Sequence, residues 1–195
     1  LETVFDALRR YEGLQQSVSE QGFPQIGDPD APLEVYQISS FSCPFCADFY
    51  LNVFPELLAR VESGEVLYIF VPFAGMGGVG DGYTASLAGV CAAQQDHFYT
   101  YAELLFAWQI RYENDAFSLS RVEQLASFAG LDFDAWQTCL IAQATNDILV
   151  EAQNFAAQVP GFTGTPSIVV DGQIIRPNTP DAINDAIDAA LVGNL

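Results

Sequence analysis

The sequence predicts an α/β fold in which a central mixed sheet, flanked by helices, carries an inserted all-helical domain. Runs of β-branched and aromatic residues predict strands at 33–38 and 66–71, and again near the C-terminus at 167–175. Apolar residues at helical spacing follow the first run and occupy the C-terminal end. Residues 83–159 show helical spacing throughout, so we expect an insertion that divides the strand-bearing part of the chain.

We therefore divide the chain into four segments. Residues 1–32 hold an N-terminal helix and a turn-rich lead-in, and residues 33–82 the first part of the sheet domain. Residues 83–159 form the insertion, and residues 160–195 the second part of the sheet domain. A chain of 195 residues, of which 50% are hydrophobic, is long enough for one domain with such an insertion.

The first half of the chain alternates helical and strand patterns. An amphipathic helix is predicted over residues 1–19, and a second helix over 47–61, after the first strand. The apolar run at 66–71 is typical of a strand that is buried on both faces. The glycine-rich segment Gly75–Gly82 lacks the Gly-Lys-Ser/Thr ending of a phosphate-binding loop, so we interpret it as a flexible connection.

The second half begins with five predicted helices, after which the spacing returns to strands. The helices are Tyr83–Gln95, Phe98–Ile110, Ser118–Ala129, Phe133–Asn146 and Ile148–Gln158. Asp171-Gly172, a dipeptide typical of two-residue turns, joins strands predicted at 167–170 and 173–175. A final helix is predicted over Asp181–Leu191, since Pro180 is suited to open it.

The composition is strongly acidic. Six arginines and no lysine face 25 acidic residues, which gives a net charge of −19 at pH 7. This charge argues against binding to nucleic acid or to anionic membrane surfaces, because both would be repelled. No apolar run is long enough to span a bilayer, and no initiator Met or signal-peptide pattern is present at Leu1. We interpret the chain as a mature or trimmed form whose targeting segment has been removed.

Two cysteines lie where the first strand turns into a helix, in the stretch Ser42-Cys43-Pro44-Phe45-Cys46. Pro44 suits the first helical position, where its missing N–H is not needed. A cysteine at a helix N-terminus has a lowered pKa, because unpaired N–H groups and the helix dipole favour the thiolate. Cys43 is therefore the candidate attacking thiol, and Cys46 can resolve a mixed disulfide. A structural disulfide or part of a zinc site are alternatives, but a C-x-x-C beside a strand–helix unit is typical of redox chemistry.

The other two cysteines, Cys91 and Cys139, are single residues within predicted helices. They could bond to each other across the insertion or remain as two buried thiols. We favour the disulfide, because the number of cysteines is even and an oxidising compartment permits such bonds. A four-cysteine zinc site is disfavoured, since Cys91 and Cys139 lack the close pairing of zinc ligands. We expect no bound metal and no cofactor.

Together these features resemble the DsbA-like thiol:disulfide oxidoreductases, whose thioredoxin fold carries an inserted helical domain. Three separated motifs support the resemblance, which covers about residues 27–192. They are the lead-in Gly27–Pro32 before Cys43-Pro44-Phe45-Cys46, the insertion with Cys91-Ala92 and His97-Phe98-Tyr99, and Gly164-Thr165-Pro166, which matches the family's cis-proline loop. The resemblance implies that the sheet domain is a thioredoxin fold.

The resemblance also implies a role for each residue of the site. Cys43 would be the exposed nucleophile, and Cys46 the buried resolving cysteine. Pro166 would follow a cis peptide bond beside the disulfide, and the backbone of Thr165 could then pair with an extended substrate segment. Among the aromatic residues, only Phe45, between the two cysteines, is expected to contact substrate.

Two positions depart from the family pattern. Gln37 stands six positions before Cys43, where the family usually has a buried acidic residue. Glutamine can hydrogen-bond but cannot take up the proton of the resolving thiol, so proton transfer would run through water or through Cys43 itself. Within the C-x-x-C, Pro44-Phe45 adds no positive charge of the kind a histidine would supply. We therefore expect a milder oxidant than the histidine-containing members.

The resemblance implies a protein dithiol oxidase that introduces disulfides into extracytoplasmic proteins, and that is itself periplasmic, secreted or membrane-anchored. Its expected partners are reduced or unfolded substrate proteins and a quinone-linked membrane reoxidase of the DsbB or VKOR type. Two alternatives remain open. One is a disulfide isomerase or reductase of the same fold, and the other is a non-catalytic peptide-binding or chaperone module that uses the groove beside Pro166.

Overall fold

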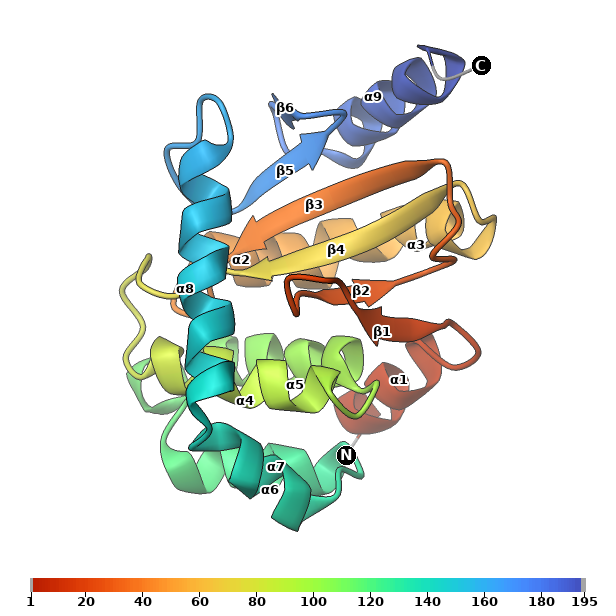
Figure 1. Cartoon of the computed structure of the whole chain (residues 1–195). Helices are drawn as coiled ribbons and strands as arrows, with labels where there is room; N and C mark the ends of the chain where they lie inside the picture. The colour runs from red at the N-terminus through yellow and green to blue at the C-terminus, as the bar shows by residue number, and fades with distance from the viewer. Residues whose placement is uncertain (1, 194–195) are drawn as a thin grey trace.

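The computed structural model describes the backbone of residues 2–193 and the side chains of residues 6–193. Within these residues the chain forms a six-stranded mixed sheet with helices on both faces (Figure 1). Across the sheet the strands follow the order β1-β2-β4-β3-β5-β6. Their bounds are β1 (Gln16–Val18), β2 (Pro24–Ile26), β3 (Leu33–Ser39), β4 (Val66–Pro72), β5 (Ser167–Val170) and β6 (Gln173–Ile175). The predicted α/β class with a helical insertion is confirmed.

The sheet is built around the parallel pair β3 and β4. All seven residues of β4 are buried, as expected of a strand that is covered on both faces. β3 pairs with β4 on one side and antiparallel with β5 on the other, so that Gln37 lies opposite Phe70 and Ile168. The strand that leads into the two cysteines therefore occupies the middle of the sheet, where both of its edges are held.

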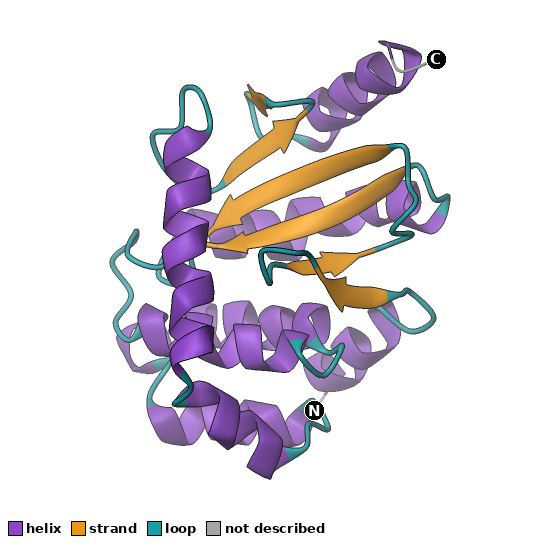
Figure 2. Ribbon diagram, in the orientation of Figure 1, coloured by secondary structure: helices purple, strands orange, loops and turns teal. Residues whose placement is uncertain are grey.

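Helices cover both faces of the sheet (Figure 2). Their bounds are α1 (Glu2–Arg10), α2 (Pro44–Asp48), the π-helical turn η1 (Phe49–Val53), α3 (Phe54–Glu62), α4 (Gly82–Ala93), α5 (Phe98–Tyr112), the 3₁₀ turn η2 (Glu113–Asp115), α6 (Leu119–Phe128), α7 (Phe133–Leu140), α8 (Gln143–Gln158) and α9 (Pro180–Gly193). The larger core packs α1, α3, α5 and α9 against one face, and a smaller core packs α8 against the other. No helix among residues 2–193 is long and apolar enough to cross a membrane.

The insertion consists of α4 to α8 and enters the chain between β4 and β5. Trp136 of α7 is fully buried, and its indole N–H donates to the Ala88 carbonyl of α4 at 3.1 Å. Cys91 of α4 and Cys139 of α7 are joined by a disulfide with a Cα–Cα distance of 5.7 Å. Residues of the insertion and of β3 and β4 belong to one continuous apolar core. The insertion is thus packed onto the sheet domain.

The N-terminal region differs from the predicted single helix over residues 1–19. α1 ends at Arg10, and Gly13 adopts a φ of +82°, a backbone conformation that favours glycine and does not continue a helix. β1 and β2 follow and form an antiparallel pair at the edge of the sheet. The lead-in therefore contributes two strands, which are too short for an alternating pattern to indicate them. Leu1, where the predicted helix begins, lies outside the described residues.

Two helical stretches have other boundaries than predicted. The helix after the cysteines begins at Pro44 and contains a π-helical turn before it continues as α3. The break predicted near Asp147 lies instead at Ile141–Ala142, between α7 and α8. There the Thr145 hydroxyl donates to the Cys139 carbonyl at 2.7 Å, and this bond satisfies a carbonyl at the end of α7.

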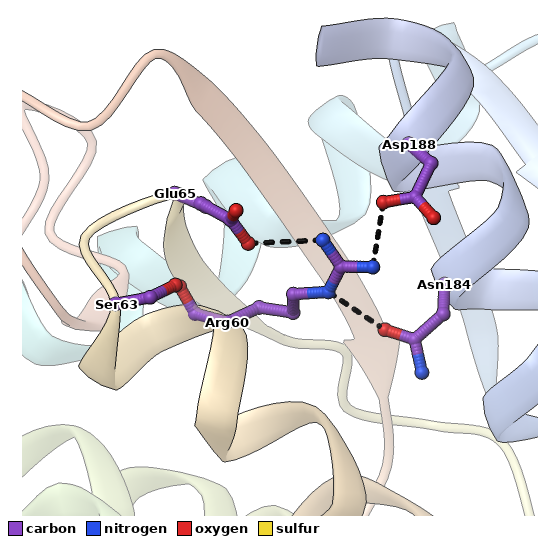
Figure 3. A network of polar contacts seen from close by, with 5 residues as sticks. All are labelled: Arg60, Ser63, Glu65, Asn184 and Asp188. Atoms are coloured by element: carbon purple, nitrogen blue, oxygen red, sulfur yellow. Dashed lines mark hydrogen bonds and ion pairs between the residues drawn. The ribbon is translucent and has the colours of Figure 1, made fainter.

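Arg60 ties the C-terminal helix α9 to the end of α3 (Figure 3). Its guanidinium donates to Asn184 Oδ1 at 3.2 Å and to Asp188 Oδ1 at 2.6 Å, both on α9. A third bond reaches Glu65 Oε2 at 2.9 Å. The planar guanidinium can hold three acceptors at once because its donors point in fixed directions. These contacts fix α9 beside the helix that follows the active-site turn.

Candidate active site

Cys43 lies in the turn between β3 and α2, at the N-cap position of the helix. Its backbone is extended, with φ −100° and ψ 115°, and Pro44 occupies the start of the helix. The Cys43 carbonyl accepts the N–H groups of Cys46 at 3.0 Å and Ala47 at 3.2 Å. The Cys43 side chain therefore stands at the end of the helix where N–H groups lack helical partners.

Both thiols are covered by the surrounding structure. The exposed fraction is 5% for Cys43, and Cys46 is fully buried. The expectation of an exposed Cys43 is therefore wrong, because the Thr165 carbonyl and the segment 75–82 lie against the turn. Phe45, between the cysteines, is the residue that projects into solvent, with an exposed fraction of 76%.

The surroundings move the pKa values of the two thiols in opposite directions. A hydrogen bond from Cys46 is the main cause that lowers the pKa of Cys43 from 9.0 to about 6. Burial opposes this shift, whereas the Thr165 side chain and the N–H groups of Cys46 and Phe45 add to it. Burial is the main cause that raises the pKa of Cys46 well above its usual value, and the interaction with Cys43 adds to it. At neutral pH Cys43 is thus the thiolate and Cys46 the thiol.

The loop before β5 lies against Cys43. The peptide bond between Thr165 and Pro166 is cis, and the Thr165 carbonyl accepts the Cys43 thiol at 3.4 Å. Asn178 Nδ2 donates to the Pro166 carbonyl at 3.0 Å, which ties the loop to the segment after β6. No sequence pattern indicated the second cis bond, Arg176–Pro177, which directly precedes Asn178.

A cleft of about 330 Å³ opens between this loop and α2. It is lined by Phe45, Asp48, Phe49, Val53, Thr165, Pro166 and Asn178. Apolar side chains predominate, and Asp48 adds one carboxylate. Asn178 Oδ1 is buried and accepts no hydrogen bond from the described residues. The cleft thus offers an apolar surface beside the loop that contacts Cys43.

Gln37 occupies a buried position on β3 and is fully covered. Its Oε1 accepts the Tyr68 hydroxyl at 3.0 Å, whereas its Nε2 has no hydrogen-bond partner in the described part of the chain. Ser39, two residues later, is on the same face of the strand and acts to lower the pKa of Cys46. A neutral amide therefore lies on the same face of β3 as Ser39, the residue that interacts with the resolving thiol.

A match to a known family covers most of the chain. The family model described as Thioredoxin matches residues 19–189. The chain belongs to the thioredoxin family. A curated relative from Rickettsia bellii (strain RML369-C), whose name describes a protein-disulfide oxidoreductase, is 23% identical over 167 residues, which are 85% of this chain and 63% of the relative. The chain thus spans less than two thirds of that protein.

Two further proteins are similar over most of their own length. Disulfide bond formation protein D of Bacillus subtilis (strain 168) is 27% identical over 190 residues, which are 90% of this chain and 80% of the relative. The crystal structure of Chlamydia trachomatis DsbA is 22% identical, with a TM-score of 0.74 over 90% of this chain and 94% of that one. This thioredoxin-family chain therefore has a DsbA-like fold.

Sequence reasoning missed how the insertion of this thioredoxin-family chain contacts the active-site turn. Gln109 of α5 is buried, and its Nε2 donates to the Phe41 carbonyl at 2.5 Å and to the Cys43 carbonyl at 3.2 Å. Gln109 lies 66 positions from Cys43 in the chain. A single glutamine on a helix produces no motif, so the sequence held no signal for this contact.

The segment Gly75–Gly82 fits closely against the turn and does more than connect β4 to the insertion. A Cβ atom at Gly77 would lie 2.0 Å from the Ser42 carbonyl oxygen, and one at Gly82 would lie 1.8 Å from Ser42 Oγ. Between them, the Val79 N–H donates to the Ser42 carbonyl at 3.1 Å. The run of glycines was the available signal, because only glycine permits such an approach.

The second cysteine pair lies outside this site. Cys91 and Cys139 are bonded to each other, with an S–S distance of 2.00 Å, whereas Cys43 and Cys46 are free thiols. Among the described residues, no group of three or more His, Cys, Asp or Glu side chains could hold a metal ion. The free thiols of the described residues, Cys43 and Cys46, both lie at the active-site turn.

Proposed function

We propose that this protein is a thiol:disulfide oxidoreductase that acts as a dithiol oxidase and introduces disulfides into extracytoplasmic proteins through Cys43 and Cys46. The observation that carries the proposal is the opposite displacement of the two pKa values, to about 6 for Cys43 and well above the usual value for Cys46. A stabilised thiolate favours the reduced pair, so the oxidised pair readily accepts electrons. The family match and the related oxidoreductases support the same activity.

The reaction runs in two exchange steps. A substrate thiolate attacks Cys43 Sγ of the oxidised protein, which breaks the Cys43–Cys46 bond and releases Cys46 as a thiolate that takes up a proton. A second substrate thiolate then attacks the substrate sulfur of the mixed disulfide, and Cys43 leaves as a thiolate. The substrate has lost two electrons, and the cysteine pair has gained them. The lowered pKa of Cys43 speeds the second step, because a thiol of low pKa leaves faster.

Substrate proteins bind, in this proposal, as extended segments at the loop that holds Thr165 and Pro166. The backbone of Thr165 pairs with the segment by strand addition. The exposed ring of Phe45 and the cleft beside it receive an apolar side chain of the substrate. Such contacts tolerate many sequences, as an enzyme that acts on unfolded proteins requires.

The reduced pair must be reoxidised before it can act again. We propose that a quinone-linked membrane oxidase of the DsbB or VKOR type accepts the two electrons. An extracytoplasmic location is supported by the Cys91–Cys139 bond, because structural disulfides persist mainly in oxidising compartments. Pro44 and Phe45 add no charge beside the Cys43 thiolate, so the oxidant is milder than a member with histidine in the motif.

The test measures how the oxidised chain and its variants oxidise a reduced, unfolded protein. We expect Cys43→Ala to lower the rate to that of the uncatalysed reaction. Cys46→Ala should accumulate a mixed disulfide with oxidised glutathione, because the resolving thiol is missing. The double variant Cys91→Ala/Cys139→Ala is the matched control and should retain activity.

Two results would contradict the proposal. If Cys43→Ala kept its activity toward unfolded protein, the chain would be a peptide-binding or chaperone module. If the potential of the pair against glutathione were near that of thioredoxin, about −270 mV, the chain would be a reductase.

A further inference from the structure

The active-site turn is held by distant parts of the chain at three successive carbonyl groups. Gln109 Nε2 reaches the Phe41 carbonyl at 2.5 Å and the Cys43 carbonyl at 3.2 Å. The Val79 N–H reaches the Ser42 carbonyl between them at 3.1 Å. Gln109 belongs to α5 of the insertion, and Val79 to the segment that leads into it. The backbone of the turn is therefore held by the insertion at Phe41 and Cys43, and by the segment before the insertion at Ser42.

Gln109 supplies two of these three bonds and is itself buried, with an exposed fraction of 3%. Burying an amide is unfavourable unless its donors are satisfied, and here both bonds are made to backbone carbonyls of the turn. An apolar residue of similar length would fill the same space. The amide is thus specifically suited to holding the two carbonyls.

The Cys43 carbonyl that Gln109 holds is also the first acceptor of helix α2, because it receives the N–H groups of Cys46 and Ala47. The orientation of this carbonyl group determines where the N–H groups in the first turn of α2 point relative to the Cys43 sulfur. The N–H groups of Cys46 and Phe45 in that turn stabilise the thiolate. A contact that fixes this carbonyl consequently acts on the sulfur without touching it.

We propose that Gln109 is a positioning residue through which the helical insertion sets the reactivity of the Cys43 thiolate. The inference rests on the proposed redox function of the pair, but its test reads the thiolate directly and needs no substrate protein. Failure of substrate oxidation in the unmodified chain would therefore concern the proposed function, and the measurements below would still decide the role of Gln109.

The main experiment compares the reduced chain with its Gln109→Met variant. Methionine keeps the length of the side chain and removes both donors, while Val79 still holds the Ser42 carbonyl. We expect the pKa of Cys43 to rise by about one unit, because the carbonyl that orders the first turn of α2 is no longer held by the insertion. The thiolate absorbance at 240 nm would follow this shift, and alkylation at pH 5 would slow about tenfold. The equilibrium constant with glutathione would change about tenfold, which is about 30 mV.

Glu103 provides the matched control on the same helix. It is another buried polar side chain of α5 that holds a distant element, since it accepts the Tyr11 hydroxyl at 2.8 Å and Arg10 Nε at 3.0 Å. Glu103→Gln should weaken the attachment of α1 and leave the titration of Cys43 unchanged. Equal shifts in Glu103→Gln and Gln109→Met would reduce Gln109 to a structural role and overturn the proposal.

A second variant, Gln109→Glu, serves if Gln109→Met does not fold. An ionised carboxylate would repel the two carbonyls, whereas the protonated acid can still donate one bond. The reactivity of Cys43 should therefore fall further once this carboxyl group ionises and recover below its pKa. A folded Gln109→Met or Gln109→Glu variant with the alkylation profile and potential of the parent would overturn the proposal.

Discussion

The two cysteine pairs of this protein are equally well covered but differ in what surrounds their sulfur atoms. Cys43, Cys46, Cys91 and Cys139 have exposed fractions of 5%, 0%, 0% and 9%. Cys43 stands at a helix N-terminus with hydrogen-bond donors directed at its sulfur. Cys91 and Cys139 lie within α4 and α7, where helical N–H groups already have carbonyl partners. The hydrogen-bond donors near the sulfur atoms, and not the exposed fraction of the side chains, therefore distinguish the reactive pair from the structural pair.

The largest expected effect comes from removing the structural pair. Cys91 and Cys139 close a loop of 48 positions, so Cys91→Ala/Cys139→Ala should lose about 4 kcal/mol of stability by loop-closure entropy. For a chain of this size the melting temperature should fall by roughly 8–16 °C. Urea unfolding measures the loss. The pKa of Cys43 should not move, and a shift in it would show that the two pairs are coupled.

The reactive pair should instead make stability depend on pH. The pKa of Cys43 is lowered from 9.0 to about 6 in the folded reduced chain, so the unfolded chain binds more protons between these values. The reduced protein should therefore gain up to about 1.4 kcal/mol per pH unit as pH rises through this window, and lose it as pH falls toward 6. The pKa of Cys46 is raised, so its proton stays bound throughout the window.

Denaturant unfolding of the reduced and oxidised chains at pH 6, 7 and 8 measures this slope. The oxidised chain lacks the titrating thiol, and Cys43→Ser removes it from the reduced chain, so both should show no such slope. A parallel pH dependence in reduced chain and Cys43→Ser would mean that another group titrates.

A smaller effect is expected from a charge placed beneath the reactive pair. Gln37→Glu should add a titration to the pH–rate profile of the resolving step, since a carboxyl group at this buried position of β3 can take up and release a proton. Gln37→Leu has a similar shape, cannot titrate and is the control. Stopped-flow measurement of glutathione release from the mixed disulfide gives the profile. Superimposable profiles for the chain and Gln37→Glu would remove any role of position 37 in proton transfer.

Much of the site could be predicted because its signals are local. The spacing of Cys43 and Cys46, the strand before them and the Thr-Pro step at Pro166 each occupy a few adjacent residues. The central strands were equally clear, since each has seven residues rich in β-branched and aromatic side chains. Periodicity can indicate such elements without knowledge of the tertiary structure.

The remainder depends on contacts between distant parts of the chain. β1 and β2 have three residues each and are stabilised by pairing in the sheet more than by their own pattern. Gln109 finds its hydrogen-bond acceptors only when α5 packs beside Phe41. The low exposure of Cys43 likewise follows from Thr165, a residue 122 positions later. None of these leaves a regular spacing in the sequence.

The long separation between Cys43 and Thr165 has a consequence for the growing chain. The whole insertion lies between them, so 122 residues must be added after Cys43 before Thr165 exists. At 5–20 residues per second this takes roughly 6–24 s. During that interval the cysteines are present without the loop that covers Cys43, and at first also without Gln109. The order of synthesis therefore leaves Cys43 without this cover until the loop at Thr165 has been made and has packed against the turn.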